Sequence, residues 1–215
     1  MKKVIFLVCI LITTSLSAQK LSIGVEGGGN VTALRTSTKY NYQGSYQTGP
    51  AFGYFLGAYG KYKLNDRTAI KLFVQGEKRS IVSKDIQLTD AAGNSLNKIN
   101  LLVSNNYLNI GALYFLRFSK YSELGIGLNN HILLSSTSYN SFLKTSFASK
   151  SGRIKNEYFK SYLISIPVQV LITFNRFTIC YSIDFGVMNR ISNSGGAYKQ
   201  FEYTAQLGVG YTLKK

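Results

Sequence analysis

The sequence predicts an all-β protein, a single eight-stranded, antiparallel, up-and-down transmembrane β-barrel. Three observations support this fold class. Long segments alternate strictly between apolar and polar or small residues, the connections between these segments are alternately short and long, and aromatic residues recur near both ends of the apolar faces. Transmembrane barrels combine these three features.

The first 18 residues have the layout of a secretory signal peptide. Lys2 and Lys3 precede an apolar run that is too short for a membrane span, and small residues end the segment at Ala18. We therefore expect residues 1–18 to be a signal peptide and residues 19–215 to form one barrel domain.

The chain is strongly basic, with 25 Lys and Arg against 9 Asp and Glu and a formal net charge of +16. Removing Lys2 and Lys3 with the signal would lower +16 to +14 and leave Cys180 as the single cysteine. Such an excess of cations favours anionic partners, either nucleic acid or a phosphate-bearing lipid surface. Because export disfavours nucleic acid, we expect outer-membrane lipid and lipopolysaccharide as partners.

Eight segments carry the period-two pattern. The last one, FEYTAQLGVGYTLKK, places Tyr203, Leu207 and Tyr211 on one face, with Gln206 and Gly208 on the other. An alternation of this kind is typical of a strand with one apolar and one polar face. In chain order the segments are 21–31, 52–64, 68–78, 107–118, 123–134, 162–174, 177–187 and 201–215.

The connections sort by length. Three are tight and contain turn-forming residues: Asn65–Arg67, Ser119–Ser122 and the pair Asn175 and Arg176. The long ones span 32–51, 79–106, 135–157 and 188–199. Strict alternation of short and long connections predicts a barrel whose two ends meet different compartments, with both termini in the periplasm.

The polar faces carry charged residues in seven of the eight segments, and the apolar faces are almost free of charge at mid-length. The charged set is Glu26, Lys61, Lys63, Lys71, Glu77, Arg117, Glu123, Asp184 and Glu202. Alternation alone also fits a soluble barrel with an apolar interior. The aromatic residues decide between the two orientations.

Aromatic residues on the apolar faces form pairs eight residues apart, with one member near a tight turn or the C-terminus and the other near a long connection. Eight residues of tilted strand climb about 20 Å, close to the apolar band of roughly 25 Å between aromatic girdles. The apolar faces are therefore expected to contact lipid. The predicted girdle residues are Tyr54, Tyr62, Phe118, Phe174, Phe177, Phe185, Tyr203 and Tyr211.

An eight-stranded barrel is only wide enough for its own side chains, so we expect the enclosed charges to form a polar plug rather than an ion path. The predicted pairs join the acids Glu26, Glu123, Asp184 and Glu202 to the bases Lys61, Lys71 and Arg117. A narrow channel for small solutes is the alternative.

A lipid-modifying enzyme is a further alternative. His131 is the only histidine, and Ser135 and Ser136 follow it closely, as a general base and a serine nucleophile could. A hydrogen-bonded lumen histidine is the favoured interpretation, and we expect no enzyme activity. Spacings typical of metal ligands are absent from the sequence, so neither a metal nor a cofactor is predicted.

Two groups of motifs resemble a known family. The unit FLGAYGKYKLNDRTAIKLFVQGE and the paired segments YLNIGALYFLRF and YLISIPVQVLITF, in which Gly111 and Pro167 correspond, resemble the PorT-like (porin-like) outer-membrane β-barrels of Gram-negative bacteria. The resemblance covers nearly all of residues 19–215. It implies a barrel in the outer membrane and admits an accessory role in protein secretion.

The C-terminus is similar to the signal read by the barrel assembly machinery. Gln206, Gly208, Tyr211 and Leu213 match its polar, glycine and alternating apolar positions, although Lys214 and Lys215 follow the last apolar residue. The resemblance therefore implies the assembly machinery as a partner.

The long connections are rich in cations and poor in acids. They hold Arg35, Lys39, Arg79, Lys84, Lys98, Lys144, Lys150, Arg153, Lys155, Arg190 and Lys199. If these connections face outward, their cations meet the phosphates of lipopolysaccharide. A structural or surface-interaction role follows as the predicted function, through membrane stabilisation, lipopolysaccharide binding or contact with an unidentified surface or secretion partner.

Overall fold

The strands close into a barrel, as the sequence predicts. The computed structural model describes residues 20–38, 47–89, 95–140, 153–155, 159–191 and 198–214. Its strands are β1 (Leu21–Thr38), β2 (Gln47–Lys63), β3 (Thr68–Thr89), β4 (Ser95–Arg117), β5 (Ser122–Asn140), β6 (Arg153–Lys155), β7 (Tyr162–Phe174), β8 (Phe177–Gly186) and β9 (Tyr198–Lys214). The predicted signal peptide lies outside the described residues, and among those residues no helix is long and apolar enough to cross a membrane.

Eight of the strands form the ring, in the order β1-β2-β3-β4-β5-β7-β8-β9, with every neighbour antiparallel. The ring closes where β9 pairs back onto β1, from Ile23 opposite Lys214 to Thr38 opposite Tyr198. Closure satisfies the backbone of the terminal strands, as a lipid environment requires. The three-residue strand β6 pairs with β5 beside the ring.

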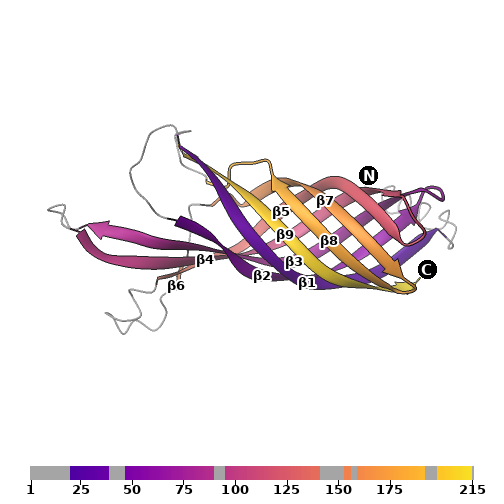
Figure 1. The fold of residues 1–215 in the computed structure, drawn as a ribbon, viewed down its shortest axis with the longest axis horizontal. Coiled ribbons are helices and arrows are strands. Elements are labelled where there is room, and N and C mark those ends of the chain that lie inside the picture. Colours follow the sequence, from indigo (N-terminus) through magenta and orange to yellow (C-terminus); the bar gives the residue numbers. More distant parts are fainter. Residues whose placement is uncertain are drawn as a thin grey trace, which may run out of the picture.

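The tight connections gather at the end of the barrel that holds the C-terminus, and the longer ones lie at the opposite end (Figure 1). Side-chain and backbone chemistry explain the tight turns. Asn65 Oδ1 accepts hydrogen bonds from the backbone N–H groups of Arg67 and Thr68, each at 2.9 Å. Asn175 has a φ of 56°, a left-handed conformation that asparagine tolerates.

The strands run further toward the long-connection end than the sequence predicts. The predicted long connection 79–106 is mostly strand, because β3 continues to Thr89 and β4 begins at Ser95, and this hairpin projects beyond the rest of the barrel (Figure 1). Burial no longer alternates here, because Arg79, Ser80 and Ile81 are all buried, but the backbone ladder continues to Ser83 opposite Leu101 before its register shifts.

Burial follows the same period of two. Along β8, buried and more exposed residues alternate from Phe177 to Asp184. Most leucine, isoleucine and aromatic side chains point outward; Leu56 and Leu207, for example, are 70% and 61% exposed. An inward-facing apolar cluster occupies the part of the lumen nearer the tight turns, formed by Phe55, Tyr59, Ala69, Phe73, Leu113, Phe115, Leu171 and Cys180.

Candidate functional site in the barrel lumen

The inward-facing residues of β3 show how the lumen changes along the barrel. Beyond Ala69, which is next to the tight turn, they run Lys71, Phe73, Gln75, Glu77 and Arg79, and all six residues are buried. Lys71 belongs to a basic mouth, Phe73 to the apolar cluster, and Glu77 and Arg79 to a central ionic cluster. One strand thus places three chemically different layers at successive depths.

Arg79 is the centre of the ionic cluster. Its Nη2 atom lies 2.8 Å from Glu77 Oε2 and 3.0 Å from Asp184 Oδ2, and its Nη1 atom lies 3.2 Å from Glu202 Oε2. All four side chains are almost fully buried. A buried cation that contacts three carboxylates compensates charges that would otherwise be costly in an enclosed lumen.

A second arginine joins this cluster from the long-connection end. Arg190 Nη1 lies 2.9 Å from Glu202 Oε1, and the guanidinium carbon lies 4.0 Å from the centroid of the Phe159 ring. The side chain is 1% exposed. An ion pair on one side and an aromatic ring on another hold this cation inside the barrel.

Amide and hydroxyl groups complete the cluster. Asn30, Asn109 and Gln206 each donate a side-chain N–H to the Glu77 carboxylate, at 2.9, 2.6 and 2.8 Å. The Tyr107 hydroxyl donates to Glu202 Oε1 at 3.2 Å. These donors come from three strands, β1, β4 and β9, and their acceptors Glu77 and Glu202 lie on β3 and β9, so the network ties much of the ring together.

His131 belongs to the same network and does not pair with the serines that follow it. Its Nδ1 lies 2.8 Å from Asn109 Oδ1, and its Nε2 lies 2.7 Å from Ser165 Oγ. Ser136 donates instead to Asn105 Oδ1 at 2.7 Å, while Ser135 lies on the outer surface, where it accepts from Asn106. The geometry is that of a hydrogen-bonded lumen histidine.

Some predicted ion pairs form and others do not. Glu26 pairs with Lys71 at 2.6 Å, and Glu123 pairs with both Lys61 and Arg117, the latter at 2.9 Å. The prediction that these three bases also serve Asp184 and Glu202 is wrong. These two acids contact Arg79 and Arg190, because they lie deeper in the lumen than the basic mouth.

The prediction that Arg79 and Arg190 are surface cations of the long connections is therefore wrong. Both side chains are buried inside the barrel. For Arg79 a sequence signal existed, since it has the same strand parity as Lys71 and Glu77. Arg35, Lys84 and Lys199 are exposed, as predicted. Lys39, Lys144 and Lys150, and the side chains of Lys98, Arg153 and Lys155, lie outside the part of the chain that the structure describes.

The predicted girdle residues lie on the outer surface. Phe177 pairs with Tyr211 at the tight-turn end, with ring centroids 5.1 Å apart, and Phe185 pairs with Tyr203 toward the other end, at 6.1 Å. Tyr62 is partly exposed. The remaining three, Tyr54, Phe118 and Phe174, are at least half exposed.

The four residues of the predicted assembly signal divide between the two faces of β9. Gln206 and Gly208 face the lumen and are buried, whereas Tyr211 and Leu213 face outward. Gly208 lies opposite Gly28 in the seam between β1 and β9. A side chain on Gly208 would begin 2.6 Å from the Phe55 ring and 2.7 Å from the Gly27 carbonyl oxygen. Close approach at the seam thus accounts for this glycine.

A polar row crosses the outer surface near the long-connection end. Tyr54, Lys78, Asn106 and Ser135 are successive partners across β2, β3, β4 and β5. Lys78 Nζ lies 6.0 Å from the Tyr54 ring centroid, and Asn106 donates to Ser135 Oγ at 2.8 Å. These residues line a groove of about 510 Å³ together with Leu102, Ser104 and Thr137.

The distribution of side chains gives the environment of the barrel. An apolar exterior with aromatic residues near both rims and an ionic, hydrogen-bonded interior is the reverse of a soluble barrel. A closed ring of strands is also the sheet that hydrocarbon permits. The chain is therefore a transmembrane barrel of the outer-membrane type, and it resides in a bacterial outer membrane.

No protein-family model and no curated protein matches the sequence. Among solved structures, the chain is similar to the attachment invasion locus protein Ail of Yersinia pestis, with 12% identity, 90% of this chain and 99% of that chain covered, and a TM-score of 0.49. Neisserial surface protein A has 9% identity, with 89% and 97% covered, and a TM-score of 0.48. The outer-membrane protease OmpT of Escherichia coli has 11% identity, with 93% and 98% covered, and a TM-score of 0.44. At such identities, function has to be argued from this chain's own side chains.

Proposed function

We propose that this chain is a non-conducting outer-membrane barrel with a structural or surface-interaction role. The observation that carries the proposal is the filled lumen. The cluster around Arg79 joins opposite walls through buried ion pairs, and the apolar cluster around Phe73 lies between it and the tight-turn end. An ion crossing the barrel would have to displace both layers.

Conductance in a planar bilayer tests this proposal. We expect no steps above background for the refolded protein at neutral pH. The double variant Phe73→Ala/Arg79→Ala, which shortens one side chain in each layer, should show channel openings if it folds. Discrete openings of the unsubstituted protein would contradict the proposal and favour a narrow channel.

The surface interaction that we propose is binding of lipopolysaccharide at the long-connection end, which we place outside the cell. The polar row around Lys78 supports it, because a cation on the outer face near an aromatic residue lies where lipid phosphates meet the apolar band. The exposed cations Arg35, Lys84 and Lys199 extend the same basic surface.

Retention of lipopolysaccharide during purification tests this interaction. Lys78→Ala should release bound lipopolysaccharide at lower salt than the unsubstituted protein, because each cation near an anionic surface contributes about 1 kcal/mol. Arg67→Ala, in the tight turn at the opposite end, is the matched control and should have no effect. Equal losses in both variants would indicate that only the overall charge matters.

We further propose that this barrel belongs to the PorT-like family. We also propose that residues 1–18 are removed, that both termini lie in the periplasm, and that the barrel assembly machinery recognises the chain. Support comes from the unit FLGAYGKYKLNDRTAIKLFVQGE, which forms the β2–β3 hairpin, and from the outward-facing Tyr211 and Leu213 of the final strand. N-terminal sequencing of the membrane-inserted protein should begin after Ala18, and cross-linking should recover the assembly machinery during insertion. An accessory secretion role would show as loss of a secreted protein when the gene is deleted.

A non-enzymatic role is part of the same proposal. His131 is 1% exposed and is bonded to Asn109 and Ser165 within the network, so no lipid can reach it in this arrangement. Mass spectra of lipid A should therefore be identical in cells with the unsubstituted protein and with His131→Ala. A difference between the two spectra would restore the lipid-modifying alternative.

A further inference from the structure

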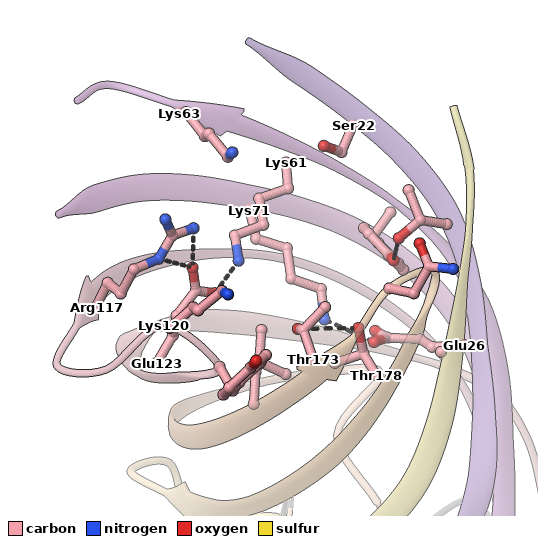
Figure 2. Close-up of a pocket in the computed structure, with 16 residues that line it drawn as sticks. Ser22, Glu26, Lys61, Lys63, Lys71, Arg117, Lys120, Glu123, Thr173 and Thr178 are labelled. Atoms are coloured by element: carbon pink, nitrogen blue, oxygen red, sulfur yellow. Dashed lines mark hydrogen bonds and ion pairs between the residues drawn. The ribbon is translucent and has the colours of Figure 1, made fainter. Parts of the chain in front are cut away.

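The lumen opens at the tight-turn end into a basic mouth, defined by Lys61, Lys63, Lys71, Arg117, Lys120 and Glu123 (Figure 2). The cavity there has a volume of about 320 Å³, at the lower end of the range for small-molecule sites. The side chains of these residues come from β2, β3, β4 and β5, and from the β4–β5 turn.

Positive charge exceeds negative charge in this mouth. Five lining residues are cations, and only Glu26 and Glu123 are acids, which leaves an excess of three positive charges. Both acids are already engaged. Glu26 contacts Lys71 at 2.6 Å, and Glu123 contacts Lys61 and also Arg117, whose Nε and Nη2 lie 3.2 and 2.9 Å from its Oε1.

Lys63 and Lys120 carry the uncompensated charge. Both are exposed at the rim, and among the described residues neither has a carboxylate within ion-pair distance. Figure 2 shows Lys61 between Lys63 and Lys120 in this view, and Lys61 is less exposed than either of them. Like charges placed this way repel each other, and a bound anion would relieve the repulsion.

Neutral hydrogen-bonding groups line the same cavity. Ser22, Thr173, Asn175 and Thr178 contribute hydroxyl and amide groups, and the ring of Tyr121 forms part of the wall. Hydroxyl and ammonium groups together suit the several acceptor oxygens of a phosphate, whereas the planar Arg117 fork is occupied by Glu123.

The mouth is blind. Leu171 and Tyr59 line it and also belong to the apolar cluster, beyond which lies the ionic cluster around Arg79. A ligand must therefore enter and leave by the same opening. This arrangement suits binding rather than passage.

From this geometry we propose that the basic mouth binds a small phosphate-bearing anion from the compartment that the tight turns face. Lys63 and Lys120 provide the charge that attracts and holds it, and the hydroxyl groups around Thr178 contact its oxygens. The anion is either a free phosphate compound or the headgroup of an anionic phospholipid that reaches the rim.

Isothermal titration of the membrane-extracted protein with pyrophosphate tests the site. The protein is placed in nanodiscs of uncharged lipid, and the double variant Lys63→Ala/Lys120→Ala is compared with Arg67→Ala/Arg176→Ala, which removes two exposed arginines of the tight turns that do not line the cavity. Loss of two charge-assisted contacts should weaken binding at least about tenfold. The control should change affinity less than about twofold.

Neither double variant removes a side chain of the ionic or apolar clusters, and cold gel mobility verifies folding of each. Absence of pyrophosphate binding to the unsubstituted protein, or equal weakening in both double variants, would overturn the proposal. Repeating the titration in nanodiscs with anionic phospholipid identifies the source. If the apparent affinity for pyrophosphate is weaker in these nanodiscs, phospholipid headgroups compete for the mouth and are its ligand. If the affinity for pyrophosphate is unchanged, the ligand is a soluble phosphate compound.

Discussion

Arg79 and Asp184 lie 3.0 Å apart at the centre of the barrel, although 105 residues separate them in sequence. Arg79 is on β3 and Asp184 on β8, and three strands lie between these two on either side of the ring. The ion pair therefore spans the lumen. Contacts of Arg79 with Glu77 and Glu202 make this guanidinium the shared partner of three buried acids.

Replacing Arg79 by methionine should strongly destabilise the folded barrel. The substitution keeps much of the side-chain volume but leaves Glu77, Asp184 and Glu202 without their common cation, and breaking a buried pair from one side costs about 3–5 kcal/mol. Urea unfolding in detergent micelles, followed by circular dichroism, measures the loss. Arg35→Met, at an exposed position on β1, is the control and should change stability by less than about 0.5 kcal/mol. A similar result for both variants would show that the ion cluster does not hold the walls together.

Gly208→Ala should weaken the seam between β1 and β9. The new methyl group would begin 2.6 Å from the Phe55 ring and 2.7 Å from the Gly27 carbonyl oxygen, so a strand or the ring must move. Overpacking of this kind costs about 1–3 kcal/mol. Gly60→Ala is the matched control, because no atom lies within 4 Å of its added carbon. Equal heat resistance of both variants in unboiled gel samples would contradict a tightly packed seam.

An arginine on the lipid-facing surface should reduce the folding free energy more, the deeper its position in the apolar band. Leu207 lies midway between the girdle residues Tyr203 and Tyr211, whereas Leu213 lies beyond Tyr211 at the end of β9. Leu207→Arg should cost about 2–4 kcal/mol and Leu213→Arg about 0–1 kcal/mol. Reversible folding into phospholipid vesicles gives both values. Equal costs at the two positions would argue against an apolar band of this height.

The fold could be predicted from the sequence because its signals are local. A period of two sets which side chains share a face, so Tyr211 and Phe177 could be assigned to the exterior and Glu202 and Asp184 to the lumen without knowledge of the ring. Asn65 and Asn175 marked tight turns through their own conformational preferences.

Partners across the lumen could not be predicted in the same way. The tilt and stagger of the strands bring Asp184 level with Arg79 rather than with Lys61, and this relation depends on the closed ring, not on neighbouring residues. The sequence places Arg79 and Arg190 in connections, because each lies just beyond the apolar stretch of its strand, where polar residues normally indicate a loop. The lumen of a barrel that extends past the apolar band is lined by such residues as well.

The central claim is that the apolar face of the barrel contacts lipid and the charged face does not. Single spin labels along β9 test it most directly, in a Cys180→Ser background of the chain without residues 1–18, with the protein reconstituted in phospholipid. Labels at Ala205, Leu207 and Val209 should collide with oxygen, which partitions into the bilayer, and labels at Thr204, Gln206 and Thr212 should not. High accessibility of the first set to a water-soluble nickel chelate, with oxygen reaching the second, would contradict the orientation of the whole barrel.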